Sequence, residues 1–280
     1  MSNNPHSTDQ PHSHTTARQV TDTASTQPTS VVLELCVGGI DDVTLAAELA
    51  VDRIELNCGM TTGGLTPSSG LVAAARRIFR GPIVAMVRPR EGGFAYSRDE
   101  FLLMLNDAER MADMGITELA IGFLRTDGTV DVERCRKLRA ILPKCHLVFH
   151  KAFDVTPDRT VAIRQLMDCG FDRILTSGGA TTALAGSREL RRLNELIQSA
   201  SSRLVLVAGG GIRAENVRDV LAESHCVQIH SAVRDVADDG SMSADCALHF
   251  GVPGGSPGSF GLASRNKLEH LLSALGKNQP

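Results

Sequence analysis

The chain has 280 residues, a formal net charge of −3 and 42% hydrophobic residues, enough apolar material for one sizeable core. A slightly acidic balance gives no basic surface for nucleic acid or for an anionic membrane. No apolar run approaches the roughly 20 residues that a membrane-spanning helix needs. We therefore expect neither a nucleic-acid partner nor a membrane partner.

The first 30 residues differ in composition from the rest of the chain. They are rich in Ser, Thr, Gln, Pro and His and lack the apolar segment of a secretory signal. This composition predicts a disordered leader at 1–30, followed by one folded domain at 31–280. The missing signal favours a cytoplasmic location, where the seven cysteines are expected to be thiols.

Eight short aliphatic runs predict strands, and helical patterns lie between them. The predicted strands are Leu33–Cys36, Arg53–Asn57, Ile83–Arg88, Glu118–Gly122, His146–His150, Asp172–Thr176, Leu204–Ala208 and Cys226–His230. Apolar residues at three- and four-residue spacing predict helices at Asp41–Ala50, Pro67–Phe79, Ser97–Met114, Asp131–Leu142, Pro157–Cys169, Thr181–Ser199, Arg213–Ala222 and Ala263–Leu275. This alternation is typical of parallel βαβ units, and eight of them predict a closed TIM-like (β/α)8 barrel of the α/β class.

Local signals refine three of these boundaries. Ser97 and Glu100 have the spacing of a capping box, and Pro157, preceded by Thr156, is expected at the first position of its helix. Gly251–Gly261 contains five glycines and two prolines, which predict a long loop after the eighth strand.

Several predicted strands carry polar side chains on one face only. Because successive side chains of a strand point to opposite sides, Glu34 and Cys36 share a face that Leu33 and Leu35 do not. The polar residues that share a face in this way on other strands are Arg53, Glu55, Asn57, Arg88, His146, His150, Gln228 and His230. A polar face of this kind indicates a closed barrel with a polar opening.

Barrels of this class build their sites at the carboxyl ends of the strands. The candidate catalytic residues there are Glu34, Glu55, His150, Asp154 and His230. Glu55 or His150 would act as the base in proton abstraction or ring opening on a small anionic molecule. The alternative is a structural layer in which Glu34 and Glu55 pair with arginines, because buried charges must be paired.

Two glycine-rich segments follow the sixth and seventh predicted strands. The candidate anion-binding residues are Arg88, Arg90, Lys151, Ser177, Gly178, Gly179, Gly209, Gly210 and Gly211. Exposed amides on such loops attract phosphate groups near the last strands of a barrel. The alternative is a pair of tight turns that need glycine for backbone freedom.

These motifs together resemble the CutC family, named for copper homeostasis, from about residue 31 to 275. The stretches that carry the resemblance are Leu33–Cys36, Asp52–Leu56, Gly63–Ser68, Arg88–Arg90, Tyr96–Ser97, Phe149–Asp154, Leu175–Gly178 and Val227–Ser231. The resemblance implies a TIM-like barrel, a cytoplasmic location, self-association into a homo-oligomer, and Cu(I) binding through cysteines at the barrel opening.

The chain departs from the family pattern in four places. Asn57 stands where the family commonly has cysteine, although Cys58 follows, and Gly93 stands in place of an aspartate. Lys151 replaces an arginine and offers a point charge instead of a planar fork. The segment after His230 is one serine shorter.

Two functions follow, with different partners. Copper ion is the first partner, held by Cys36 and Cys58 with His150 or His230 across the opening, because Cu(I) favours thiolates and then imidazoles. In the alternative, Cys36 is an inert barrel residue and Cys58 points outward. A small anionic or phosphorylated molecule is the second partner, in an enzyme of unknown reaction. A purely structural or partner-binding barrel would leave the polar opening without a purpose.

Overall fold

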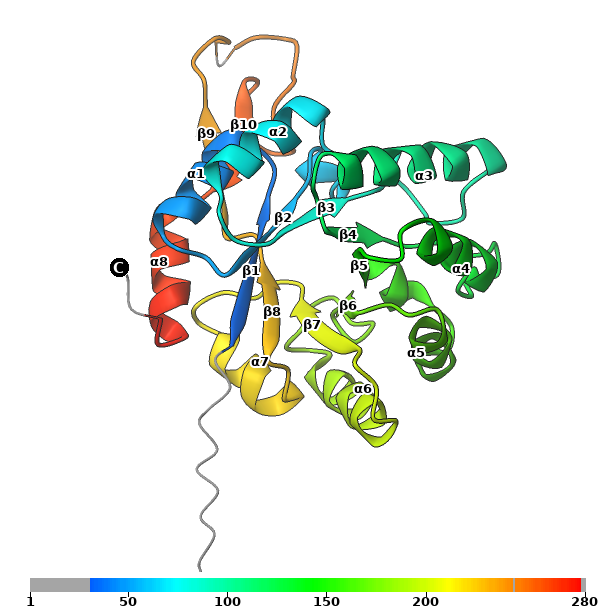
Figure 1. Cartoon of the computed structure of the whole chain (residues 1–280). Coiled ribbons are helices and arrows are strands. Elements are labelled where there is room, and N and C mark those ends of the chain that lie inside the picture. Colours follow the sequence, from blue (N-terminus) through cyan, green and yellow to red (C-terminus); the bar gives the residue numbers. More distant parts are fainter. Residues whose placement is uncertain (1–30, 244, 278–280) are drawn as a thin grey trace, which may run out of the picture.

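The computed structural model describes residues 31–243 and 245–277, and the predicted leader at 1–30 lies outside them. Eight parallel strands close into a barrel in chain order, which confirms the predicted TIM-like fold (Figure 1). They are β1 (Val32–Val37), β2 (Arg53–Leu56), β3 (Ile83–Met86), β4 (Glu118–Ile121), β5 (His146–Phe149), β6 (Arg173–Thr176), β7 (Val205–Gly209) and β8 (Gln228–Ser231).

Helices surround this barrel and cover the outer face of its strands (Figure 1). They are α1 (Ile40–Glu48), α2 (Ser69–Ile78), α3 (Arg98–Asp113), α4 (Val132–Ile141), α5 (Arg159–Asp168), α6 (Ser187–Ser199), α7 (Val217–Ser224) and α8 (Arg265–Ala274). Two short 3-10 helices, η1 (Met60–Thr62) and η2 (Lys151–Val155), follow β2 and β5. Within the described ranges, no helix is both long enough and apolar enough to cross a bilayer.

The cap signals of the sequence were right for α3 and wrong for α5. Ser97 Oγ accepts from the Glu100 amide at 3.1 Å, and the Glu100 carboxylate accepts from the Ser97 amide at 2.6 Å, a complete capping box. For α5 the N-cap is Asp158, whose carboxylate accepts from two amides of the first turn. Thr156 instead donates its hydroxyl to the Phe153 carbonyl and ends η2.

Two predicted helices begin four or more residues later than expected. The helix predicted from Thr181 begins at Ser187, because the Ala183 amide donates to the Gly210 carbonyl and ties the preceding segment to the loop after β7. The helix predicted from Arg213 begins at Val217, because the Arg213 amide donates to the Asn216 side chain in a turn. A tertiary hydrogen bond replaces the first helical turn in the first case, and a local side-chain turn replaces it in the second.

The segment predicted as a long glycine-rich loop contains a strand. β10 (Ser259–Ala263) pairs antiparallel with β9 (Arg234–Asp238), and this two-stranded ribbon projects beyond the barrel next to α1 (Figure 1). Asp42 of α1 anchors the ribbon: its carboxylate accepts from the Ala263 amide at 2.7 Å, from Arg234, and from the Gly38 amide at 2.8 Å. Pairing with β9 therefore outweighs the poor strand propensity of this segment.

The pleat of the strands divides the buried side chains into two sets. Leu33, Leu35 and Ile54 point outward and join the large core between the strands and the helices. Their neighbours point into the barrel, where a small apolar cluster is formed by Val84, Met86, Ala120, Val148, Leu175 and Val207. The interior of β1, β2 and β8 is polar instead, and the candidate site lies there.

Candidate metal centre and its surroundings

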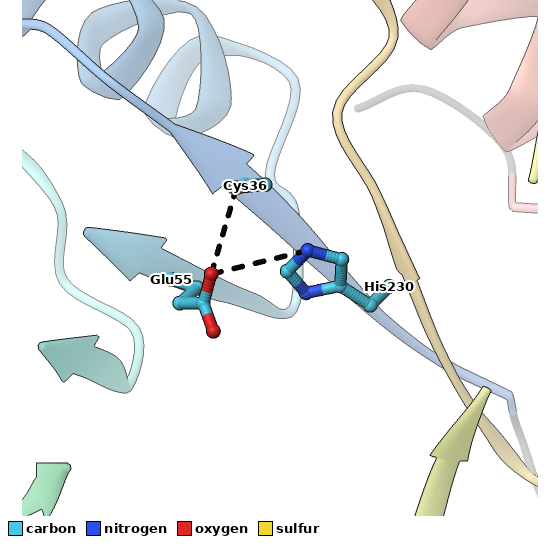
Figure 2. A group of neighbouring side chains, drawn as sticks. All are labelled: Cys36, Glu55 and His230. Atoms are coloured by element: carbon cyan, nitrogen blue, oxygen red, sulfur yellow. Dashed lines mark hydrogen bonds and ion pairs between the residues drawn. The ribbon is translucent and has the colours of Figure 1, made fainter. Parts of the chain in front are cut away.

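Three side chains from neighbouring strands converge at the carboxyl-terminal end of the barrel interior. Cys36 of β1 lies opposite Glu55 of β2 in the strand register, and His230 of β8 lies opposite Glu34 of β1. One ligand atom from each of Cys36, Glu55 and His230 lies within 4.8 Å of the other two. Figure 2 shows the three side chains pointing toward one another, and we call them the Cys–Glu–His group.

Glu34 orients the imidazole of this group. His230 Nδ1 lies 2.8 Å from the Glu34 carboxylate, and Nε2 faces Glu55 at 3.9 Å. Burial by itself raises the pKa of Glu34, but the hydrogen bond from His230 and the charge of Arg53 outweigh it and lower that pKa to about 2. Burial opposes the charged form of His230, yet Glu55, Cys36 and Glu34 together raise its pKa well above 6.5. At neutral pH the ring is therefore protonated, with Nδ1 directed at the Glu34 carboxylate and Nε2 facing the group.

The thiol of Cys36 lies in a crowded polar pocket. Its Sγ is 3.5 Å from Glu55 Oε2, 3.4 Å from Asn57 Nδ2 and 3.9 Å from Met60 Sδ. Burial, followed by the nearby Glu55 carboxylate, raises the pKa of Cys36 to about 11. Burial also raises the pKa of Glu55 from 4.5, and His230 only partly offsets it. At neutral pH the thiol therefore keeps its proton beside a carboxylate with increased basicity.

Met60 is a member of this neighbourhood that the sequence did not indicate. It begins η1, directly after Gly59, which adopts a left-handed φ of 58°. Gly38 makes room for the thioether, because a Cβ at that position would lie 2.4 Å from Met60 Cγ. A methionine in a loop has no periodicity that identifies it, so only the folded chain reveals its approach to Cys36.

Cys58 lies outside the Cys–Glu–His group. Its thiol donates to the Thr66 carbonyl at 3.0 Å, and its backbone forms an antiparallel bridge with Leu65. The strand alternation carries Asn57, not Cys58, to the interior face, where Asn57 Nδ2 donates to Glu55 Oε2 at 2.9 Å. No interaction among the described residues joins the thiols of Cys36 and Cys58, which the sequence had paired as copper ligands.

The two arginines expected to bind an anion are engaged by the protein itself. Arg88 donates to the carbonyls of Thr62, Gly64 and Gly92 at 2.8–3.0 Å. Arg90 pairs with Glu100 and donates to three further carbonyls of its own loop. Most N–H donors of the two guanidinium groups are therefore used to hold the loops after β2 and β3 in place.

The Ser177–Gly179 loop surrounds a carboxylate that belongs to the chain. Asp154 accepts from the Ser177 and Gly179 amides at 2.9–3.1 Å and from the Thr176 and Ser177 hydroxyls, and it pairs with Lys151 at 2.9 Å. Burial alone raises the pKa of Asp154, but Lys151 and these hydrogen bonds lower it below 3.8. These amides therefore bind an oxyanion that belongs to the chain itself, and binding of an anionic ligand by this loop stays a prediction. Gly178 lies in the same turn with its amide on Thr176 Oγ1.

His150 lies apart from Glu55, with which the sequence paired it. Its Nδ1 accepts from the Ala152 amide at 3.2 Å, and its ring packs on Phe94 at a centroid distance of 5.0 Å. Burial, followed by the charge of Arg88, lowers the pKa of His150 to about 3, so the ring is neutral. No interaction among the described residues joins it to the Cys–Glu–His group.

The Gly209–Gly211 segment has a more open environment. Gly209 ends β7 inside the barrel, where a Cβ would lie 2.5 Å from Leu175 Cδ1. Gly210 and Gly211 line a cavity of about 770 Å³ together with Lys151 and His230. Of the candidate anion-binding residues, these two glycines and Lys151 therefore border open space beside the candidate metal centre.

Comparisons with known proteins point to one family. Residues 31–235 match the profile of the CutC family. The chain is 36% identical to a CutC family protein of Treponema denticola over 222 residues, covering 79% of this chain and 89% of the relative. It is 34% identical to the copper homeostasis protein cutC homolog of Homo sapiens, covering 79% of this chain and 80% of that protein.

A solved structure agrees with these relatives. The crystal structure of a copper homeostasis protein CutC from Streptococcus agalactiae matches with a TM-score of 0.67 and 30% identity. The match covers 71% of this chain and 97% of that one. Sequence and fold therefore identify the same relatives.

Proposed function

Because the chain belongs to the CutC family, we propose that it takes part in copper handling by holding Cu(I) at Cys36 and His230, with Met60 as a third ligand. The observation that carries this proposal is the convergence of Cys36, Glu55 and His230 within 4.8 Å, beside a thioether 3.9 Å from the Cys36 thiol. The proposal keeps Cys36 from the sequence-based pair and replaces Cys58.

The donor chemistry fits the ion. Cu(I) is soft and prefers thiolate and thioether sulfur, with imidazole next, whereas a carboxylate suits harder cations. Cys36 and Met60 supply the two kinds of sulfur, and His230 supplies Nε2. Glu34 accepts from His230 Nδ1, the arrangement in which a carboxylate fixes the tautomer of a metal-binding histidine.

Glu55 is assigned a different task from the three ligands. A thiol must lose its proton before it binds a metal ion, and the pKa of Cys36 is raised to about 11. Glu55 Oε2 lies 3.5 Å from Cys36 Sγ and has a raised pKa, so it is positioned to accept that proton as copper binds. His230 Nε2 must also release its proton before it binds copper, because the pKa of His230 is raised. Uptake of one Cu(I) with release of that proton to solvent leaves the buried charge of the group unchanged.

An anaerobic Cu(I) titration against a chromophoric chelator tests the proposal. We expect one equivalent to bind, Cys36→Ser to lower the affinity by about 100-fold or more, and Met60→Leu to lower it by about tenfold, because each removes a sulfur ligand. Cys58→Ser is the matched control and should leave the affinity unchanged.

Two outcomes would count against this site. Wild-type affinity in Cys36→Ser, with an unchanged circular dichroism spectrum, would exclude a thiolate site at this position. A loss in Cys58→Ser as large as that in Cys36→Ser would restore the two-cysteine site that the family resemblance implied.

A second candidate function is acid–base catalysis on a small anionic molecule. It is favoured by the opposed pKa directions of groups around one opening, with Glu34 lowered and Glu55 and His230 raised. In this function Glu55 works with His230 rather than with His150. A screen of small phosphorylated molecules for proton exchange in D2O checks it: an activity that disappears in Glu55→Gln supports catalysis, and a panel without exchange argues against it.

The cytoplasmic location and the homo-oligomer stay predictions. Size-exclusion chromatography with light scattering measures the second directly. We expect a mass of at least twice the 29.9 kDa of one chain, and the mass of a single chain would contradict the predicted homo-oligomer.

A further inference from the structure

We propose that the cavity at the carboxyl ends of β7 and β8 binds the phosphate group of a small phosphorylated molecule. We call it the β7–β8 cavity. It has a volume of about 770 Å³, and its lining consists of Lys151, Gly210, Gly211, Ile212, Arg213, Ala214, Glu215, Asn216, His230, Ser231, Ala232, Val233, Arg234, Lys267 and His270. This inference goes beyond copper binding and does not depend on it.

The lining of the cavity is rich in cationic side chains. Among the described residues it includes four Lys or Arg side chains, Lys151, Arg213, Arg234 and Lys267, against one carboxylate, Glu215. Lys151, Arg234 and Lys267 are paired with Asp154, Asp42 and Asp235, whereas Arg213 is exposed and forms no ion pair with any described residue. A dianion in this cavity would therefore meet a free guanidinium group, which binds phosphate in a planar, two-pronged manner.

The backbone of the loop after β7 is arranged to donate. Asn216 Nδ2 donates to the Gly211 carbonyl at 2.8 Å, and Ser231 Oγ donates to the Ile212 carbonyl at 2.7 Å. The amides of Gly211 and Ile212, by contrast, donate to no acceptor among the described residues. Gly210 and Gly211 have φ angles of 118° and 65°, values that glycine adopts more readily than other residues.

A second loop of the same barrel, Ser177–Gly179, shows which kind of group binds to backbone amides in this region. The Ser177 and Gly179 amides bind the Asp154 carboxylate, an oxyanion that belongs to the chain. The loop after β7 lies next to it: a Cβ at Gly210 would be 3.5 Å from Lys151 Nζ and 3.3 Å from Ser177 Cβ. No described carboxylate accepts from the Gly211 or Ile212 amides, so this loop is free to bind an oxyanion from solution.

The position of the cavity limits what the rest of the ligand can contact. His230 lines the cavity, whereas Cys36 and Glu55 do not. A molecule anchored by its phosphate group at Gly211 and Arg213 would thus extend toward the imidazole face of the Cys–Glu–His group. The volume is sufficient for a phosphorylated metabolite and not only for a free ion.

Phosphate titration of the full chain, followed by amide NMR shifts and calorimetry at constant ionic strength, tests the inference. With inorganic phosphate as probe, we expect saturable shifts of the Gly211 and Ile212 amides. Arg213→Gln should weaken binding by about tenfold, the usual effect of losing one charge-assisted contact. Arg191→Gln, which changes an exposed arginine of α6, is the matched control and should bind as the wild type does.

A sugar pair sharpens the result. Ribose 5-phosphate should bind at least as tightly as inorganic phosphate, and ribose should not bind. Equal affinity for the two sugars, shifts that do not saturate, or equal affinities of the Arg213→Gln and Arg191→Gln variants would each overturn the inference. Cys36→Ser should keep phosphate binding while it loses copper, so failure of the copper proposal is measured separately.

Discussion

The two sides of the barrel interior have opposite chemistry although they share one fold. The side formed by β8, β1 and β2, the polar half, contributes Glu34, Cys36, Arg53, Glu55, Gln228 and His230. The side formed by β3 to β7, the apolar half, contributes Val84, Met86, Ala120, Val148, Leu175 and Val207. The ion pair between Glu118 and Arg173 lies on the apolar half, toward the amino-terminal ends of its strands.

The two halves of the barrel interior differ in what they contribute: the apolar half contributes mainly to stability, and the polar half contributes the ionisable groups. The interior cluster of the apolar half needs only close packing, and burial of each of its aliphatic side chains is favourable without a partner. In the polar half every buried charge must be compensated, so Arg53 bridges Glu34 and Gln228 at 2.6 and 2.7 Å. A set of compensated charges contributes little to stability, but it shifts pKa values and presents ligand atoms.

The largest effect is expected where compensation in the polar half is removed. Arg53→Met leaves the Glu34 carboxylate buried with His230 as its main partner, and we expect the free energy of unfolding to fall by about 3–5 kcal/mol. Urea denaturation measures it. Arg191→Met, which breaks an exposed pair on α6, should change stability by less than about 0.5 kcal/mol. A similar small loss in Arg53→Met would mean that the polar half needs no internal pairing.

A somewhat smaller effect is expected in the apolar half. Leu175 is buried in the interior cluster, and Leu175→Ala creates a cavity that should cost about 3 kcal/mol of unfolding free energy. Copper affinity should be retained, because no proposed ligand lies on this half. Leu102→Ala on the exposed side of α3 is the control and should be nearly neutral. Loss of copper binding without loss of fold would show that the two halves are coupled.

The smallest effect concerns the histidine at the end of the apolar half. The pKa of His150 is lowered to about 3, against 6.5 for the unfolded chain, so the unfolded state binds one more proton between these values. The neutral buried ring therefore costs no stability above about pH 6.5, and the free energy of unfolding falls as the pH is lowered from 6.5 toward 3. His150→Gln should therefore reduce the loss of unfolding free energy between pH 7.5 and 4.5 by about 2–3 kcal/mol. Parallel pH profiles of the two proteins would argue that the ring is not buried as a neutral group.

The barrel was predictable from sequence because its signals are local and repeated. Alternating aliphatic runs, helical spacing and the Ser97 capping box each depend on neighbours only a few residues apart. The same alternation correctly assigned Glu34, Cys36, Glu55 and His230 to one interior face. It could not predict that β10 pairs with β9, because that pairing joins segments more than twenty residues apart.

The composition of the candidate site was less predictable, because competing partners decide it. Arg88 has the charge to bind an anion, yet three loop carbonyls use its guanidinium group. The Ser177–Gly179 loop has amides that could bind an anion, yet the Asp154 carboxylate of the same chain accepts their hydrogen bonds. Met60 approaches Cys36 only because η1 folds back over Gly38. Residue type indicates what a side chain can bind, and only the assembled loops determine which partner it meets.

One carboxylate, that of Asp42, fastens two walls of the barrel opening to each other. It holds the Gly38 amide, two residues beyond Cys36, and Arg234, four residues beyond His230. The segment after Cys36 and the segment after His230 are therefore both hydrogen-bonded to the same carboxylate. Without this carboxylate the two walls could shift relative to each other, so a helix that contributes no ligand atom helps to set the distance between the sulfur and the nitrogen.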